Sequence, residues 1–132
     1  MILLSNGLNT QNRYSNSASQ IDARQKILCD NAKAAGIGHL LRFEKRDVAE
    51  FAPPDGPPGI LICNPPYGER IGEEQELKGL YRTLGDVFRE RCAGWTMWVF
   101  TGNAFLARQI GKPAQVVDLF NGKIPCRLLR YE

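Results

Sequence analysis

The pattern of hydrophobic and polar positions divides the chain into a polar beginning and a longer, patterned remainder. Ser and Asn alone fill eight of the fifteen positions from Ser5 to Ser19, without any hydrophobic period. Such a composition is typical of linkers and disordered segments. We therefore expect residues 1–20 to form a linker or a disordered segment and residues 21–132 to fold.

Three segments carry the periodicity or the capping residues of helices. Asp22 and Gln25 have the spacing of an N-cap and a capping box, and they predict a helix that runs to Ala35. Apolar residues recur at helical spacing over residues 77–88, with acidic residues before them and arginines after them, which matches the helix dipole. A shorter helix is expected over residues 103–110.

Five segments have the pattern of β-strands. The run Ile60–Cys63 is continuously apolar, as in a strand that is covered on both faces of a parallel sheet. Asn121-Gly122 lies between two alternating runs, which is the strongest short-range signal for a hairpin. The predicted strands are His39–Lys45, Ile60–Cys63, Trp95–Thr101, Gln115–Phe120 and Ile124–Tyr131.

This order of elements predicts an open α/β fold, with a mostly parallel sheet and a C-terminal antiparallel hairpin. The 132 residues are enough for one domain with one hydrophobic core. Ligands of open α/β sheets bind beyond the carboxyl ends of the strands. Asn64 follows a predicted strand directly, so it is expected at such an end.

Composition narrows the classes of function. No apolar run approaches the length of a membrane span, and the apolar start is too short for a signal peptide, so we expect a cytoplasmic protein without a membrane partner. The four cysteines form no CxxC pair, and the single His39 has no ligand-like neighbour, so no metal site is expected. The formal charge of +3 permits a nucleic-acid partner.

The segment Asn64-Pro-Pro-Tyr67 carries the candidate chemistry. Proline fixes its own φ and pushes the preceding residue toward extended geometry, so this segment is a stiff elbow. The side-chain oxygen of Asn64 and the backbone carbonyl of Pro65 can present two acceptors to one group with two N–H bonds. An exocyclic amine is such a group.

An aromatic residue directly after the elbow offers a face for a planar ring. Tyr67 would stack on the base or amide that bears the amine. Two hydrogen bonds to the amine pull its lone pair out of conjugation with the ring. The amine then becomes competent to attack an electrophilic methyl group, by position and electrostatics rather than by a strong base.

The motif Asn64-Pro-Pro-Tyr67 resembles that of S-adenosylmethionine-dependent amino-methyltransferases. Together with its surroundings it is similar to bacterial 23S rRNA guanine-N2 methyltransferases, which carry an RNA-binding THUMP domain upstream. The resemblance implies an incomplete Rossmann-like class I methyltransferase sheet, with residues 21–132 as about the C-terminal two thirds of the domain. The segments that carry it are Asn64–Arg70, Leu80–Asp86, Phe100–Gly102, Phe120–Gly122 and Cys126–Glu132.

The resemblance also implies roles for the residues of the elbow. Asn64, Pro65 and Pro66 would hold the guanine N2 amine. Tyr67 would stack on the flipped base. The substrate would be RNA, specifically 23S rRNA.

A second set of roles concerns the cofactor, S-adenosylmethionine. Asp47 would take the place of the acid that binds the adenine amine, with Val48 beside it. Ile21 would pack on the adenine, and Asp22 would cap the helix that follows. Asn64 would lie next to the cofactor as well as the substrate.

The sequence departs from the family at the start of the cofactor site. No Gly-rich turn precedes Ile21, and Gln20 stands where these enzymes usually place an acid for the ribose. Two hypotheses follow: the catalytic part of an rRNA guanine-N2 methyltransferase, or a noncatalytic fragment without the cofactor loop. An enzyme for another planar amine, DNA adenine or protein glutamine, is disfavoured by the segments around Asn121 and at the C-terminus.

Such an incomplete sheet would expose strand edges. Residues 1–4 or a second copy of the chain could close them, so a homo-oligomer is expected as one outcome. Arg89 and Arg91 are interpreted as ordinary surface charges. Trp95 and Trp98 are interpreted as core residues of a strand.

Overall fold

The computed structural model describes residues 3–5, 23–41, 43, 46–68 and 73–132. Its contacts divide the chain into two compact units, one formed by residues 1–7 with residues 47–132, the other by residues 8–46. The roles predicted for Ile21 and Asp22 fall outside the described residues.

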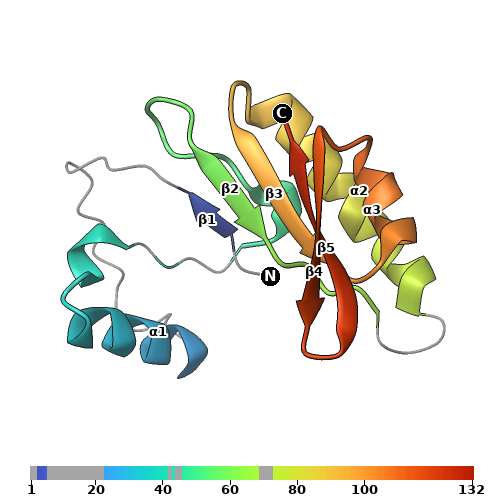
Figure 1. The fold of residues 1–132 in the computed structure, drawn as a ribbon. Helices are drawn as coiled ribbons and strands as arrows, with labels where there is room; N and C mark the ends of the chain where they lie inside the picture. The colour runs from blue at the N-terminus through green and yellow to red at the C-terminus, as the bar shows by residue number, and fades with distance from the viewer. Residues whose placement is uncertain (1–2, 6–22, 42, 44–45, 69–72) are drawn as a thin grey trace. The chain divides into compact units, whose positions relative to one another are not determined.

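The first unit is built on one five-stranded sheet with the order β1-β2-β3-β5-β4 (Figure 1). β2 and β3 run parallel, with Ile60 beside Thr96 and Cys63 beside Val99. β5 runs antiparallel to both β3 and β4. The strands are β1 (Leu3–Ser5), β2 (Ile60–Cys63), β3 (Thr96–Thr101), β4 (Gln115–Asn121) and β5 (Ile124–Tyr131).

The α/β class and the C-terminal hairpin are confirmed, but the sheet is less parallel than predicted. Among the described strands one pairing is parallel and three are antiparallel. β1 contributes to this difference because it pairs antiparallel with β2, with Leu3 beside Cys63. The edge of β2 is therefore closed by residues 3–5, within the segment 1–20 that was expected to be a linker or disordered.

Two helices cover one face of the sheet, α2 (Glu73–Arg91) and α3 (Ala104–Ile110) (Figure 1). Alternate strand residues are buried beneath them, as the pleat requires. The opposite face is more open, because Ile60 and Ile62 are 40% and 43% exposed. The prediction that this strand is covered on both faces is therefore wrong for its outer residues. The main buried residues are Leu61, Cys63, Tyr81, Leu84, Phe88, Met97, Val99, Leu106, Ile110, Leu129 and Tyr131.

α2 covers the predicted segment from its acidic start to its arginine end, and it approaches α3 closely at one position. A Cβ atom on Gly85 would lie 2.7 Å from the backbone oxygen of Ile110. Glycine costs helix stability relative to alanine, so this contact explains why α2 has a glycine there. No helix in the described part of the chain is long and apolar enough to cross a membrane.

The second unit contains α1 (Ala23–Ala34) and a short 3-10 helix, η2 (Gly38–Leu40). α1 ends near the predicted position, where Gly36 has φ +73. The predicted strand His39–Lys45 is wrong at its described start, since His39 and Leu40 lie in η2. The backbone of η2 closes its own turn, with the Leu40 N–H bonded to the Ile37 carbonyl, and so does not pair with another strand there.

Candidate active site

The elbow Asn64–Tyr67 begins directly after β2, at its carboxyl end. β3 runs parallel to β2, so the residues that follow Thr101 lie at the same edge of the sheet. The Pro65 side chain is fully buried, whereas Asn64 and Pro66 are exposed. The elbow is thus anchored through Pro65 and leaves the Asn64 amide open to an incoming group.

Tyr67 is fixed at its backbone oxygen and at its hydroxyl. Asn103 Nδ2 donates to the Tyr67 backbone oxygen (3.3 Å), and Asn121 Nδ2 donates to the Tyr67 hydroxyl oxygen (3.0 Å). Gly102 lies against the ring, because a Cβ atom there would be 3.1 Å from the ring atoms Cδ2 and Cε2. The half-buried ring is therefore positioned by β3, by α3 and by the β4–β5 hairpin.

Asn103 joins the elbow to two helices. Its Oδ1 accepts from the backbone N–H groups of Phe105 (3.0 Å) and Leu106 (3.1 Å), which makes it the N-cap of α3. Its Nδ2 also donates to Glu74 Oε1 at 2.7 Å, in the first turn of α2. One side chain therefore sets the position of Tyr67 relative to both helices.

The buried groups beneath the elbow stay neutral at physiological pH. Burial raises the pKa of the Cys63 thiol, next to Asn64, to about 12. Burial also raises the pKa of Tyr81 to about 12, while its hydroxyl pairs with Thr101 Oγ1 at 2.9 Å. A neutral thiol is a weak nucleophile, so these two groups support the shape of the site rather than covalent chemistry.

Asp47, the predicted ligand of the cofactor's adenine amine, begins a 3-10 helix, η3 (Val48–Glu50). Its Oδ1 accepts from the Ala49 backbone N–H at 2.8 Å, and Val48 is buried in the core. Arg91 Nη1 donates to the carbonyls of Ala49 and Phe51, both at 2.9 Å. An exposed carboxylate held in this way can accept from an adenine amine with its second oxygen, so Asp47 fits the role implied for it.

The sequence analysis assigned no site role to Gly102, Asn103, Asn121 or Arg91, although Gly102 and Asn121 lie in segments that carry the family resemblance. The capping preference of Asn at the start of the third predicted helix could have indicated Asn103. The other three act on residues that are distant in the sequence, and no local pattern indicates this. Arg91, interpreted as a surface charge, holds the turn that follows Asp47.

Comparison with known proteins identifies the family of the chain. A family model described as RMKL-like, methyltransferase domain matches residues 4–130. The ribosomal RNA large subunit methyltransferase K/L of Syntrophotalea carbinolica is 45% identical over 107 residues, which cover 78% of this chain and 15% of that protein. The chain spans between 14% and 27% of the length of the first curated relatives that it matches.

Two solved structures share the fold. SMU.472, crystallised in complex with SAH, has a TM-score of 0.73 at 26% identity, over 83% of this chain and 29% of that chain. A predicted N6-adenine-specific DNA methylase from Listeria monocytogenes str. 4b F2365 has a TM-score of 0.69 at 32% identity, over 85% of this chain and 28% of that chain. The sheet is thus a methyltransferase-like sheet. On the match over residues 4–130, the chain belongs to the family of RMKL-like methyltransferase domains.

Proposed function

We propose that this chain carries the target-binding part of a methyltransferase that transfers a methyl group from S-adenosylmethionine to the N2 amine of guanine in large-subunit rRNA. The family match and the name of the Syntrophotalea relative support the methyltransferase class and the rRNA substrate. The observation that carries the proposal is the elbow at the end of β2, where Asn64 is exposed and Tyr67 is fixed by Asn103 and Asn121.

In this proposal the residues of the elbow bind and orient the amine. Asn64 Oδ1 and the Pro65 backbone oxygen accept its two N–H bonds, and Tyr67 stacks on the guanine ring. Because the two prolines stiffen the elbow, both acceptors are in place before the base arrives. The Asn103 and Asn121 hydrogen bonds keep the ring of Tyr67 from turning away.

The cofactor, when bound, supplies the electrophilic methyl group. Asp47 would hold its adenine amine, with Val48 beside it and with Ile21 and Asp22 implied by the family resemblance. The bound SAH in SMU.472 supports a cofactor of this class for the fold. Arg91 would hold the turn after Asp47 in place, because it donates to the carbonyls of Ala49 and Phe51.

Methylation of another planar amine is the second candidate. The likeness to the Listeria structure, named as an N6-adenine-specific DNA methylase, favours adenine as the alternative base. An adenine N6 amine offers the same two N–H bonds to the elbow. The two candidates differ in the methylated nucleoside that they form.

Isothermal titration calorimetry with S-adenosylmethionine, followed by transfer of a labelled methyl group to rRNA fragments, tests the proposal. We expect saturable binding by the 132-residue chain and N2-methylguanosine in the digested RNA. Asp47→Asn should weaken binding about 5-fold, because a neutral amide is a poorer acceptor than a carboxylate. The matched control is Asp55→Asn, a change of another exposed acid in the proline-rich loop.

Each contrary result has a definite meaning. If the chain binds no cofactor, the methyltransferase hypothesis is contradicted and a noncatalytic fragment is favoured. Methyl transfer to adenine in DNA, without transfer to guanine in RNA, would favour the second candidate. If Asp47→Asn and Asp55→Asn change the affinity for S-adenosylmethionine equally, Asp47 does not bind the cofactor.

A further inference from the structure

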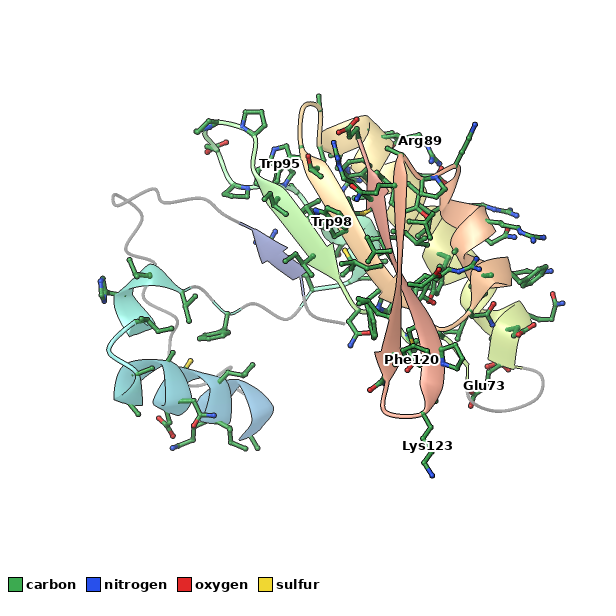
Figure 2. The ribbon with its side chains drawn as sticks, in the orientation of Figure 1. Glu73, Arg89, Trp95, Trp98, Phe120 and Lys123 are labelled. Carbon is green, nitrogen blue, oxygen red and sulfur yellow. The ribbon has the colours of Figure 1, made fainter. Side chains whose placement is uncertain are left out.

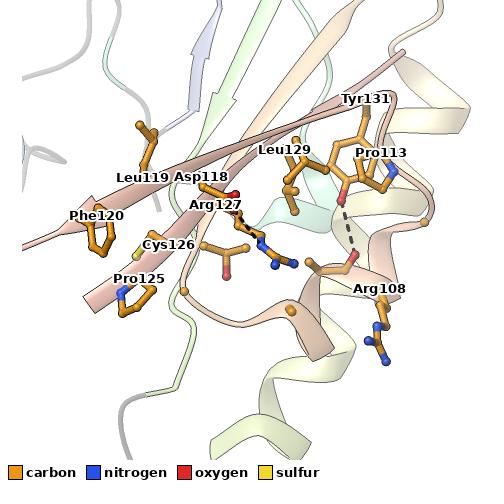
Figure 3. A pocket seen from close by; sticks show the side chains of 16 residues that line it. Arg108, Pro113, Asp118, Leu119, Phe120, Pro125, Cys126, Arg127, Leu129 and Tyr131 are labelled. Atoms are coloured by element: carbon orange, nitrogen blue, oxygen red, sulfur yellow. Dashed lines mark hydrogen bonds and ion pairs between the residues drawn. The ribbon is translucent and has the colours of Figure 1, made fainter. Parts of the chain in front are cut away.

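A groove of about 600 Å³ lies between α3 and the β4–β5 hairpin (Figure 3). Phe120 and Pro125 line one end, and Pro113 and Tyr131 line the other. Arg127 lies between them, and its Nε donates to Asp118 at 3.3 Å. A groove of this size can take a nucleotide, since small-molecule sites enclose about 300–1,000 Å³.

The hairpin presents unusual apolar surface to this groove. Val116 is 48% exposed, and Phe120 is 73% exposed. Figure 2 shows Phe120 near the turn of the hairpin, from which Lys123 projects. An exposed aromatic ring beside basic side chains is the arrangement on which single-stranded nucleic-acid bases stack.

The positive charge of the chain is concentrated in the C-terminal segment, which contains the groove. Residues 104–132 contain five basic and two acidic residues, and this difference of three equals the formal charge of the whole chain. The basic residues are Arg108, Lys112, Lys123, Arg127 and Arg130. This part of the protein therefore attracts a polyanion more strongly than the rest.

The groove is continuous with the elbow. Thr101 and Gly102 belong to its lining, and Gly102 lies against the ring of Tyr67. The residue after Phe120 is Asn121, which donates to the Tyr67 hydroxyl. A chain of nucleotides with one base at Tyr67 would pass Gly102 to enter the groove that Phe120 lines.

We propose that this groove binds a single-stranded RNA nucleotide next to the target guanine, with its base stacked on Phe120 and its phosphate held by Arg108 and Arg127. This proposal rests on the proposed function, because it takes the base at Tyr67 to be the target guanine. A guanidinium has five N–H donors, so Arg127 can bind a phosphate and keep its bond to Asp118. The groove would then contribute to the choice of target sequence, because the flanking base is bound together with the target.

Fluorescence anisotropy with a fluorescein-labelled RNA hexamer that contains one central guanosine tests this proposal. We expect Phe120→Ala to weaken binding of the hexamer about 10-fold, as expected for one lost stacking contact. The matched control is Phe105→Ala, which removes an exposed ring on α3 that lies under the Lys78 ammonium and does not line the groove. Arg108→Glu should weaken binding about 10-fold, and the matched reversal Arg82→Glu on α2 less than 2-fold.

The outcomes separate this proposal from the proposed function. If Phe120→Ala transfers methyl groups with an unchanged KM for RNA, RNA binding in the groove is contradicted and the proposed function is not. If the chain binds the hexamer through Phe120 but binds no S-adenosylmethionine, RNA binding in the groove is supported and the proposed function is contradicted. A chain that does not bind the hexamer, or binds it equally in Phe120→Ala and Phe105→Ala, would overturn the groove.

Discussion

The elbow and the turn after Asp47 are both held in place, but two distant side chains bond to the elbow and only one of those described bonds to the turn. The elbow is fixed by Pro65 in the core and by Asn103 and Asn121 from two further elements. The Asp47 turn is fixed by its own cap, by the buried Val48 and by one guanidinium, that of Arg91.

The difference shows which half of the predicted site is self-contained. All described partners of the elbow lie in the unit formed by residues 1–7 and 47–132. Of the residues implied for the cofactor, Asp47 and Val48 are described and belong to the same unit, whereas positions 21 and 22 fall outside the described residues. The target-binding half should therefore keep its geometry when the cofactor half is disturbed.

Among the variants that test this comparison, Asn64→Ala should have the largest effect on the rate of methyl transfer. It removes one of two acceptors for the amine, and loss of one such contact typically lowers the rate by about 100-fold or more. The exposed side chain contributes little to folding, so the midpoint of thermal unfolding should stay within about 2 °C. Methyl-transfer kinetics and circular dichroism measure both, with the exposed Asn31→Ala as control. Unchanged kinetics would remove Asn64 from the site.

Asn103→Ala should affect both the elbow and the stability of the fold. It removes the N-cap of α3 and should lower the free energy of unfolding by about 1 kcal/mol. Asn103→Ser should restore most of that stability, because serine caps helices but cannot reach the Tyr67 carbonyl as the amide does. Urea unfolding measures the stability. Full methyl transfer by the serine variant would show that the bond to Tyr67 has no role.

Gly102→Ala should disturb the elbow without touching the turn after Asp47. The added Cβ would lie 3.1 Å from the ring of Tyr67, so the ring must shift by a few tenths of an ångström. Because a misplaced binding group lowers rates strongly, we expect methyl transfer to fall about 5-fold. Gly79→Ala in α2 is the control, since its Cβ would meet nothing within 4 Å. Equal kinetics in both variants would contradict a positioned ring.

Arg91→Ala should have the smallest effect, and it should be limited to the cofactor half. Loss of two hydrogen bonds to the carbonyls of Ala49 and Phe51 frees the turn after Asp47. Affinity for S-adenosylmethionine should fall about 3-fold, which is less than one ordinary hydrogen bond contributes. Calorimetry measures it, with Arg82→Ala as control. A loss of RNA binding in Arg91→Ala would show that the two halves are not independent.

Much of the fold could be predicted because its signals are local. The helix over residues 77–88, the Asn121-Gly122 turn and the elbow each depend on spacing or on proline chemistry within a few residues. The direction of β1 could not be predicted, because a three-residue strand carries no signal for its partner. The strand expected over residues 39–45 was wrong at its start, since alternation alone does not separate a strand from a short 3-10 turn.

The site was predictable to the same extent. The sequence predicts that Asn64 and Tyr67 would face an amine, because they are adjacent to the prolines that orient them, and this role stays a prediction. It does not predict what holds Tyr67, since Asn103 and Asn121 are 36 and 54 positions away along the chain. The fold alone brings them together.

NMR titration of the isotope-labelled chain with guanosine monophosphate and with inosine monophosphate tests the central claim most directly. The two ligands have the same ring and phosphate and differ only in the exocyclic N2 amine. We predict that guanosine monophosphate shifts the side-chain amide signals of Asn64 and the ring signals of Tyr67, at concentrations at least about 5-fold lower than inosine monophosphate. Equal shifts with both ligands would contradict recognition of the amine by the elbow.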